Sequence, residues 1–195
     1  MKTKTLIGKG LVAGFIITIM FSGILAFTEE TDNELMNRAV QTLVCLKNRD
    51  YKQLAKLVHK KKGVTFSPYA YINDDAVKLT AARIKTLKPT DIFFWGYYDG
   101  SGHDMNLSVE DYFARFVFDQ DFTQAPQTGI NELLKKGNTV SNLNRVFPGA
   151  DFVEFHFPGI DPKYDGIDWT SLRLVFEKEG KQWMLVGIVH DCWTI

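Results

Sequence analysis

The sequence predicts an α+β fold in which N-terminal helices pack on a mostly antiparallel sheet. Two amphipathic helical patterns come first, over residues 31–47 and 50–58. Strand patterns dominate the remainder, and the most regular is a hairpin over 168–195, whose first arm alternates apolar and polar residues. Its second arm, 183–190, is apolar on both faces, which is typical of a strand covered on both sides.

Residues 1–27 precede these elements and are typical of a secretory signal peptide. Three lysines form a positive start, an apolar run follows, and small residues predict cleavage after Ala26. An uncleaved membrane anchor is the alternative, because the run from 11 to 27 just reaches the lower limit of a spanning helix, about 17 residues. In both cases we expect the domain to be extracellular or at the cell surface, with membrane contact only through this segment.

The first predicted helix opens with a capping box, in which Thr31 and Glu34 each satisfy a free backbone amide. A second box, from Asp50 to Gln53, begins a shorter helix that ends at Gly63. The apolar stripe of the first helix consists of Leu35, Met36, Ala39, Val40, Leu43 and Leu46.

The predicted elements beyond Gly63 are short and separated by turn residues. A strand at 64–66 stops before Pro68, and Thr80 caps a helix that extends to Leu87. The others are an aromatic strand at 91–98 with a turn at 99–102, a helix that begins at Ser108, a helical segment at 139–146, and a strand at 151–157. We therefore expect one domain over residues 28–195.

Composition excludes some functional classes. Lys plus Arg equals Asp plus Glu, at 23 each, so the chain lacks the basic excess that nucleic-acid binding requires. The four histidines and two cysteines show no spacing typical of a metal site, and we expect no cofactor and no metal. A disulfide could join only Cys45 to Cys192, but Cys45 lies away from the apolar stripe. The sequence is compatible with a monomer or a homodimer.

Three stretches carry a family resemblance: 47–69, 107–122 and 151–195, the last including the runs DWTSLRLVF and VGIVHDCWTI. In these the chain resembles exported bacterial proteins of the NTF2-like, or cystatin-like, superfamily, most of which have no assigned activity. The resemblance implies a cone-shaped domain whose curved sheet wraps a long helix and encloses a pocket. Its motifs specify a fold rather than a chemistry.

Four residues are candidates for acid–base chemistry: Glu154, His156, His190 and Asp191. Glu154 and His156 share one face of a strand, and an acidic group beside a histidine in an apolar cone is what NTF2-like isomerases and dehydratases use. The alternatives are ordinary cross-strand pairs on the outer face and a His190 ring bonded to a backbone carbonyl.

Aromatic residues are candidates for ligand binding, namely Trp95, Tyr97 and Trp193. The sequence carries no catalytic signature, so we expect an exported, non-catalytic domain that binds a small apolar ligand or a cell-surface protein. The alternative is a pocket enzyme of the isomerase or dehydratase type.

Overall fold

The computed structural model describes the backbone of residues 11–194 and the side chains of residues 29–194. It contains two compact units, one ending at Glu34 and one beginning at Leu35. Among the residues described in full, no helix is long and apolar enough to cross a membrane. Residues 1–10 and the side chains of the apolar run at 11–27 lie outside the described part, so the signal peptide or anchor stays a prediction.

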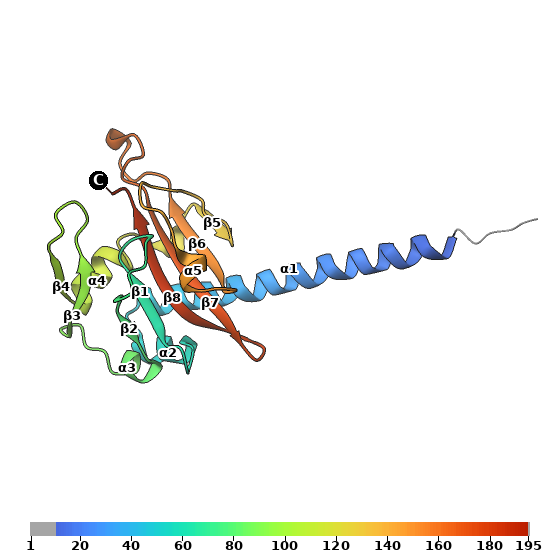
Figure 1. Ribbon diagram of the computed structural model, residues 1–195, viewed down its shortest axis with the longest axis horizontal. Coiled ribbons are helices and arrows are strands. Elements are labelled where there is room, and N and C mark those ends of the chain that lie inside the picture. The colour runs from blue at the N-terminus through green and yellow to red at the C-terminus, as the bar shows by residue number, and fades with distance from the viewer. Residues whose placement is uncertain (1–10, 195) are drawn as a thin grey trace, which may run out of the picture. The chain divides into compact units, whose positions relative to one another are not determined.

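The elements after α1 are at most eight residues long, except the last two strands, β7 and β8 (Figure 1). Helix α1 is continuous over Leu11–Lys47, so the prediction of a helix start at Thr31 is wrong. No Gly or Pro interrupts the chain between Gly23 and Gly63, and a helix can therefore continue through the capping box. The other elements are α2 (Tyr51–Leu57), β1 (Val64–Ser67), β2 (Lys78–Leu79), α3 (Ala81–Lys85), β3 (Ile92–Tyr97), β4 (Asp104–Ser108), α4 (Val109–Phe116), η1 (Phe122–Gln124), β5 (Gln127–Ile130), α5 (Leu143–Val146), β6 (Asp151–Phe157), η2 (Pro162–Tyr164), β7 (Thr170–Glu179) and β8 (Gln182–Cys192).

The main sheet has six strands in the order β2-β1-β8-β7-β6-β5, and β3 and β4 form a separate hairpin. All neighbours in the main sheet are antiparallel except β1 and β8, which run parallel. The predicted α+β class and mostly antiparallel sheet are therefore confirmed. The C-terminal hairpin is confirmed as β7 and β8, which occupy the middle of the sheet.

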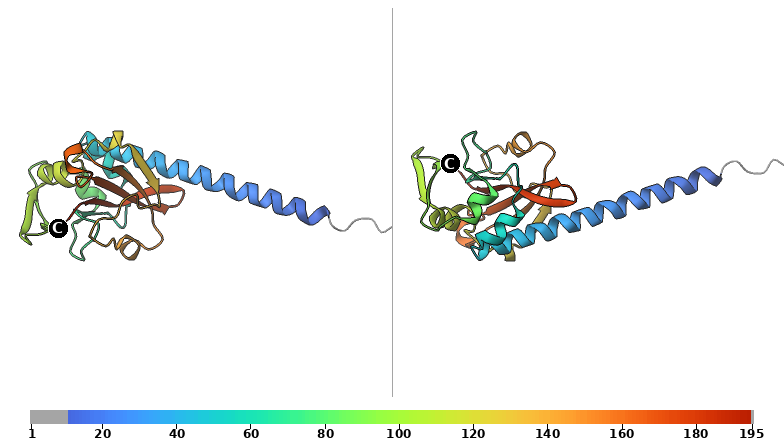
Figure 2. Two further views of the ribbon diagram at one scale, coloured as in Figure 1. Left: turned by 90° about the horizontal axis from the view of Figure 1, so that it is seen from above. Right: turned by 90° about the horizontal axis from the view of Figure 1, so that it is seen from below.

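A bulge bends the central hairpin. Val175 pairs with Gly187 but Phe176 pairs with Leu185, which leaves Val186 as an extra residue in β8. A bulge of this kind increases the local twist and curves the strand. The twisted course of β7 and β8 is visible in Figure 2.

The larger core lies on one face of the sheet, here called the inner face, against residues 35–47 of α1. Buried side chains from α1, α2 and α4 meet β6, β7 and β8 there. The predicted α1 stripe is confirmed except at Val40, which is 45% exposed. Thr42 is buried in this part of the helix, and its hydroxyl donates to the Arg38 carbonyl at 2.9 Å, so burial leaves no donor unpaired.

The opposite, outer face carries a second apolar cluster with the short helix α5 on it. Phe147 approaches Gly187 so closely that an added Cβ would lie 2.8 Å from its ring. Both faces of the sheet are therefore covered in its centre, as the apolar composition of β8 predicts.

The helix caps follow the sequence signals, but some boundaries do not. Asp50, Thr80 and Ser108 each accept a hydrogen bond from a backbone amide in the first turn of the following helix. Helix α2 ends at Leu57 rather than at Gly63, because Val58 leaves the helix and bridges Leu185 of β8. The helical segment predicted at 139–146 is present only as α5, and β2 and β5 were not predicted.

Replacing Gly63 with Ala should lower the free energy of unfolding by about 2–3 kcal/mol, measured by urea denaturation. Gly63 has a φ of 70°, and an added Cβ would lie 2.5 Å from the Leu79 carbonyl oxygen of β2. Gly180→Ala is the matched control, because Gly180 has a φ of 65° and no atom within 4 Å of an added Cβ. The control should lose about 1 kcal/mol. If Gly63→Ala and Gly180→Ala lose equal free energy of unfolding, β2 moves aside without cost.

Candidate functional site

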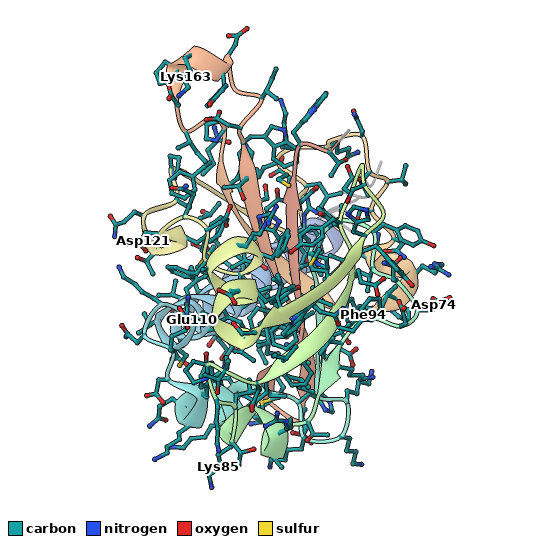
Figure 3. The ribbon with its side chains drawn as sticks, turned by 90° about the vertical axis from the view of Figure 1, so that its left-hand side faces the viewer. Asp74, Lys85, Phe94, Glu110, Asp121 and Lys163 are labelled. Carbon is teal, nitrogen blue, oxygen red and sulfur yellow. The ribbon has the colours of Figure 1, made fainter. Side chains whose placement is uncertain are left out.

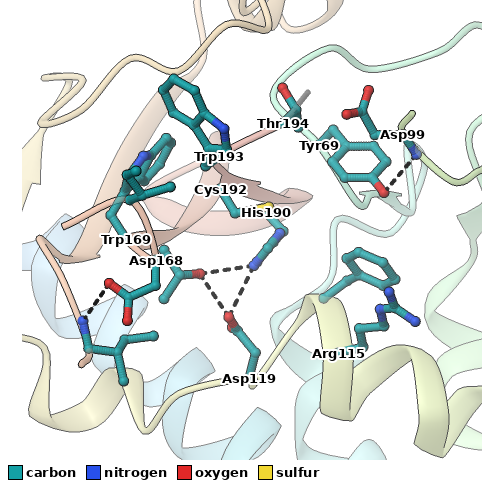
Figure 4. Close-up of a pocket in the computed structure, with 14 residues that line it drawn as sticks. Tyr69, Asp99, Arg115, Asp119, Asp168, Trp169, His190, Cys192, Trp193 and Thr194 are labelled. Atoms are coloured by element: carbon teal, nitrogen blue, oxygen red, sulfur yellow. Dashed lines mark hydrogen bonds and ion pairs between the residues drawn. The ribbon is translucent and has the colours of Figure 1, made fainter. Parts of the chain in front are cut away.

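A pocket of about 360 Å³ opens where β7 begins and β8 ends. The end of α4, the chain just after it, and the loop after β6 form its other walls (Figure 4). Its lining combines the rings of Tyr69, Phe116, Trp169 and Trp193 with polar groups. Its volume lies within the range of small-molecule sites, about 300–1,000 Å³.

His190 lies at the base of this pocket in a closed triangle of polar groups (Figure 4). Its Nε2 is 2.9 Å from Thr170 Oγ1 and 3.3 Å from Asp119 Oδ2, and Thr170 Oγ1 donates to the same carboxylate oxygen at 2.8 Å. Its Nδ1 is 3.0 Å from the Pro68 carbonyl oxygen. A carbonyl and a carboxylate only accept hydrogen bonds, so this arrangement favours an imidazolium that donates from both nitrogens.

The pKa shifts of His190 and Asp119 agree with this geometry. Burial lowers the pKa of His190, but hydrogen bonding and charge from Asp119 and Cys192 outweigh burial and raise the pKa to about 10. Burial raises the pKa of Asp119, while the hydrogen bonds from His190 and Thr170 bring that pKa below its ordinary value. His190 and Asp119 therefore form a buried ion pair at neutral pH.

Asp119 is the site residue that the sequence analysis missed. It follows α4 by three residues, in a stretch without periodicity, and contacts His190 from 71 positions away. A local pattern does not encode such a pairing.

Glu154 and Asp191 lie on the outer face, where both bind Arg173. Arg173 Nε donates to Glu154 Oε2 at 2.8 Å, and its Nη2 donates to Asp191 Oδ2 at 2.7 Å. All three side chains are at most 2% exposed. The four acid–base candidates therefore do not converge on one cavity. The alternation of β6 and β7 puts Glu154 and Arg173 on the face opposite His190.

His156 is also on the outer face and is buried. Its Nδ1 is 2.8 Å from Ser171 Oγ, and its ring lies against Trp169. Burial is the main reason that the pKa of His156 is lowered, so the ring is neutral at pH 7. The prediction that His156 and Glu154 lie on the same face of the sheet is confirmed. In the described part of the chain, however, His156 bonds Ser171 and Glu154 bonds Arg173, and the two side chains do not bond each other.

The three aromatic candidates lie in different environments. Trp95 is buried, stacks on Tyr112 with ring centres 3.7 Å apart, and donates from Nε1 to the Leu107 carbonyl. It is a core residue and does not line the His190 pocket. Tyr97 is 49% exposed on the β3–β4 hairpin and lines a different pocket.

Figure 3 shows the hairpin, with Phe94 labelled, and α4, with Glu110 labelled. Trp193 is the one aromatic candidate that lines the His190 pocket, and it is 47% exposed.

Both cysteines are free thiols, with Cys192 in the pocket wall and Cys45 on α1. Among the described residues, no group of three or more His, Cys, Asp or Glu side chains could hold a metal ion.

Comparisons with known proteins give little further information. No protein-family model matches the chain, and no curated protein matches it. A solved structure whose title begins with Rd1NTF2 matches 82% of this chain and 98% of its own, with 12% identity and a TM-score of 0.35. A similarity of this size does not establish a fold family.

Proposed function

We propose that this chain is an exported, NTF2-like domain that binds a small ligand in the His190 pocket without catalysing a reaction. The packing of α1 residues against the inner face of a bulged, mostly antiparallel sheet supports the cone architecture. The position of the pocket at one end of that inner face supports the binding role.

The non-catalytic assignment rests on one observation: each acid–base candidate is already held by hydrogen bonds or ion pairs within the protein. A general acid or base at pH 7 needs a pKa near 7 and a free position beside the substrate. His190 is held between Pro68 and Asp119 with its pKa raised to about 10. Glu154 and Asp191 are bound to Arg173 on the other face. His156 is bonded to Ser171 on that face as well. None of the four candidates therefore offers the isomerase or dehydratase alternative a free acid or base in this pocket.

The pocket walls favour an amphipathic ligand over the purely apolar ligand expected from the sequence. Phe116 and Trp193 offer ring surfaces, while Arg115, Asp119 and Thr170 offer polar groups beside them. A ligand with both an apolar face and hydrogen-bonding groups would match both kinds of wall.

A cell-surface protein is a second candidate partner, and one observation favours it. Four large apolar side chains at or near the pocket mouth are 47–56% exposed: Ile160, Tyr164, Ile167 and Trp193. Exposed apolar groups that cluster in this way are common at protein–protein contacts.

Native mass spectrometry of the protein recovered from its own cells should detect a bound small molecule and a new N-terminus near Phe27 or Thr28. The same spectrum distinguishes a monomer from a homodimer. Trp193→Ala should reduce the ligand-bound fraction at least tenfold, while Tyr97→Ala, which removes a ring of similar exposure outside the pocket, should leave that fraction unchanged.

A ligand-free protein with an intact N-terminus in the cytoplasm would contradict both the binding and the export proposals. Recovery of a protein complex that Trp193→Ala disrupts, with no small molecule bound, would instead select the cell-surface partner.

A further inference from the structure

The mouth of the pocket presents a flat aromatic surface beside buried polar atoms. Trp193 lies at this mouth with 47% of its surface exposed, and Tyr69 and Trp169 line the same pocket (Figure 4). An exposed indole offers a rigid apolar face at low cost in conformational entropy. Such a face suits a ligand that has a flat apolar side of its own.

Two buried polar atoms of the pocket lining have no hydrogen-bond partner among the described residues. One is the Nε1 donor of Trp169, a side chain that is 1% exposed. The other is Oδ1 of Asp119, whose second oxygen already accepts from Thr170. A buried polar atom without a hydrogen-bond partner destabilises the folded protein. A ligand that both accepts and donates hydrogen bonds would remove this cost, and a hydroxyl group does both.

The charges around the pocket nearly cancel. His190 neutralises Asp119, and the Asp168 carboxylate accepts from the backbone amides of Ile160 and Asp161. Arg115 lies over the Tyr98 ring at 4.9 Å. With Asp99, the lining holds three carboxylates and two cations, a small net negative charge. A phosphate would meet no excess of positive charge here, so the lining favours a neutral ligand over an anionic one.

We infer that the pocket binds a neutral carbohydrate, a mono- or disaccharide unit, and this inference rests on the proposed binding function. A sugar ring combines a face of C–H groups, which stacks on Trp193, with hydroxyls that accept from Trp169 Nε1 and donate to Asp119 Oδ1. Trp193 supplies apolar contact, and the two buried atoms orient the ring.

The test is a titration of the full chain with cellobiose, N,N′-diacetylchitobiose and maltose, followed by tryptophan fluorescence and calorimetry. At least one sugar should bind saturably at millimolar or lower concentration. Trp193→Ala should weaken that binding at least tenfold. Trp169→Phe keeps an aromatic ring but removes the indole N–H together with part of the indole, and it should weaken binding about threefold to tenfold.

Two variants serve as matched controls. Trp183→Phe also removes a buried indole N–H without a partner, but Trp183 lies near the far end of β8, beside Lys178. Tyr97→Ala removes a half-exposed ring outside this pocket. Both should bind the sugar as the parent does. Melting temperatures of all four variants show whether each one is folded.

The same experiment includes decanoate and decanol as apolar probes, so that the two proposals can fail separately. If only an apolar probe binds and Trp193→Ala abolishes its binding, the pocket function stands and the carbohydrate assignment is overturned. Sugar binding that both pocket variants leave unchanged also overturns the assignment. Absence of saturable binding by every probe overturns the pocket function as well.

Discussion

Replacing Arg173 with Met should lower the free energy of unfolding by about 3–5 kcal/mol at pH 7, measured by urea denaturation. Arg173 is 1% exposed and makes ion pairs with both Glu154 and Asp191, which are themselves buried. The substitution keeps most of the volume but leaves two carboxylates in the protein interior without a counter-charge. Desolvation of such groups is the dominant cost. Burial raises the pKa of Asp191 above its ordinary value, so the loss should shrink in acid as this carboxyl takes up a proton.

Two further variants separate charge from packing. Arg83→Met removes a partly exposed partner of Asp91 and should cost less than about 1 kcal/mol. Combining Arg173→Met with Glu154→Gln and Asp191→Asn should recover part of the loss, because no buried charge remains. If Arg173→Met costs no more than Arg83→Met, the carboxylates reach water beneath residues 133–141, and the account of a buried triad is wrong.

The second large effect is a loss of stability with rising pH. The pKa of His190 is raised from an ordinary value of 6.5 to about 10 in the folded state. Between these values the folded chain holds one more proton than the unfolded chain. Stability should therefore be complete below pH 6.5 and should fall by about 1.4 kcal/mol per pH unit until about pH 10. Urea denaturation at half-unit pH steps measures this slope.

His190→Gln isolates the contribution of the ion pair, because Lys and Tyr side chains also titrate near pH 10. This variant should be less stable than the parent at pH 6.5, and the difference should narrow as the pH approaches 10. Asp119→Asn removes the carboxylate that keeps His190 protonated. The difference in stability between the parent and Asp119→Asn should therefore also narrow over this pH range. A constant difference between parent and His190→Gln across this range would contradict a protonated His190.

Local patterns in the sequence predicted much of the fold. Strand β6 begins and ends where the alternation from Asp151 to Phe157 predicts, and the caps at Asp50, Thr80 and Ser108 form as their spacing indicates. Strand β2 has two residues and β5 has four without apolar alternation, so neither carries a periodic signal. The parallel pairing of β1 with β8 joins segments over a hundred residues apart, which no local pattern describes.

The candidate site was less predictable because it, too, depends on contacts between distant parts of the chain. Alternation correctly grouped Glu154 with His156, but it could not say which face of the sheet they occupy. Apolar residues cover both faces in the centre of this sheet: Leu174 and Ile188 on the inner face, and Val189 on the outer face. The pocket depends instead on where α4 ends relative to β7, and that is decided by tertiary packing.

The order of the strands also constrains how the chain can assemble. Strand β8, which lies between β1 and β7, follows every other strand of the main sheet in the sequence. Until β8 has been synthesised, β1 and β2 have no neighbour that joins them to β7, so the sheet stays in two parts. Native contacts between the first and last thirds of a chain have high contact order and slow the folding reaction. The two parts of the sheet therefore cannot join before β8 is made, and a chain truncated before Gln182 would lack a strand from the middle of the sheet rather than from its edge.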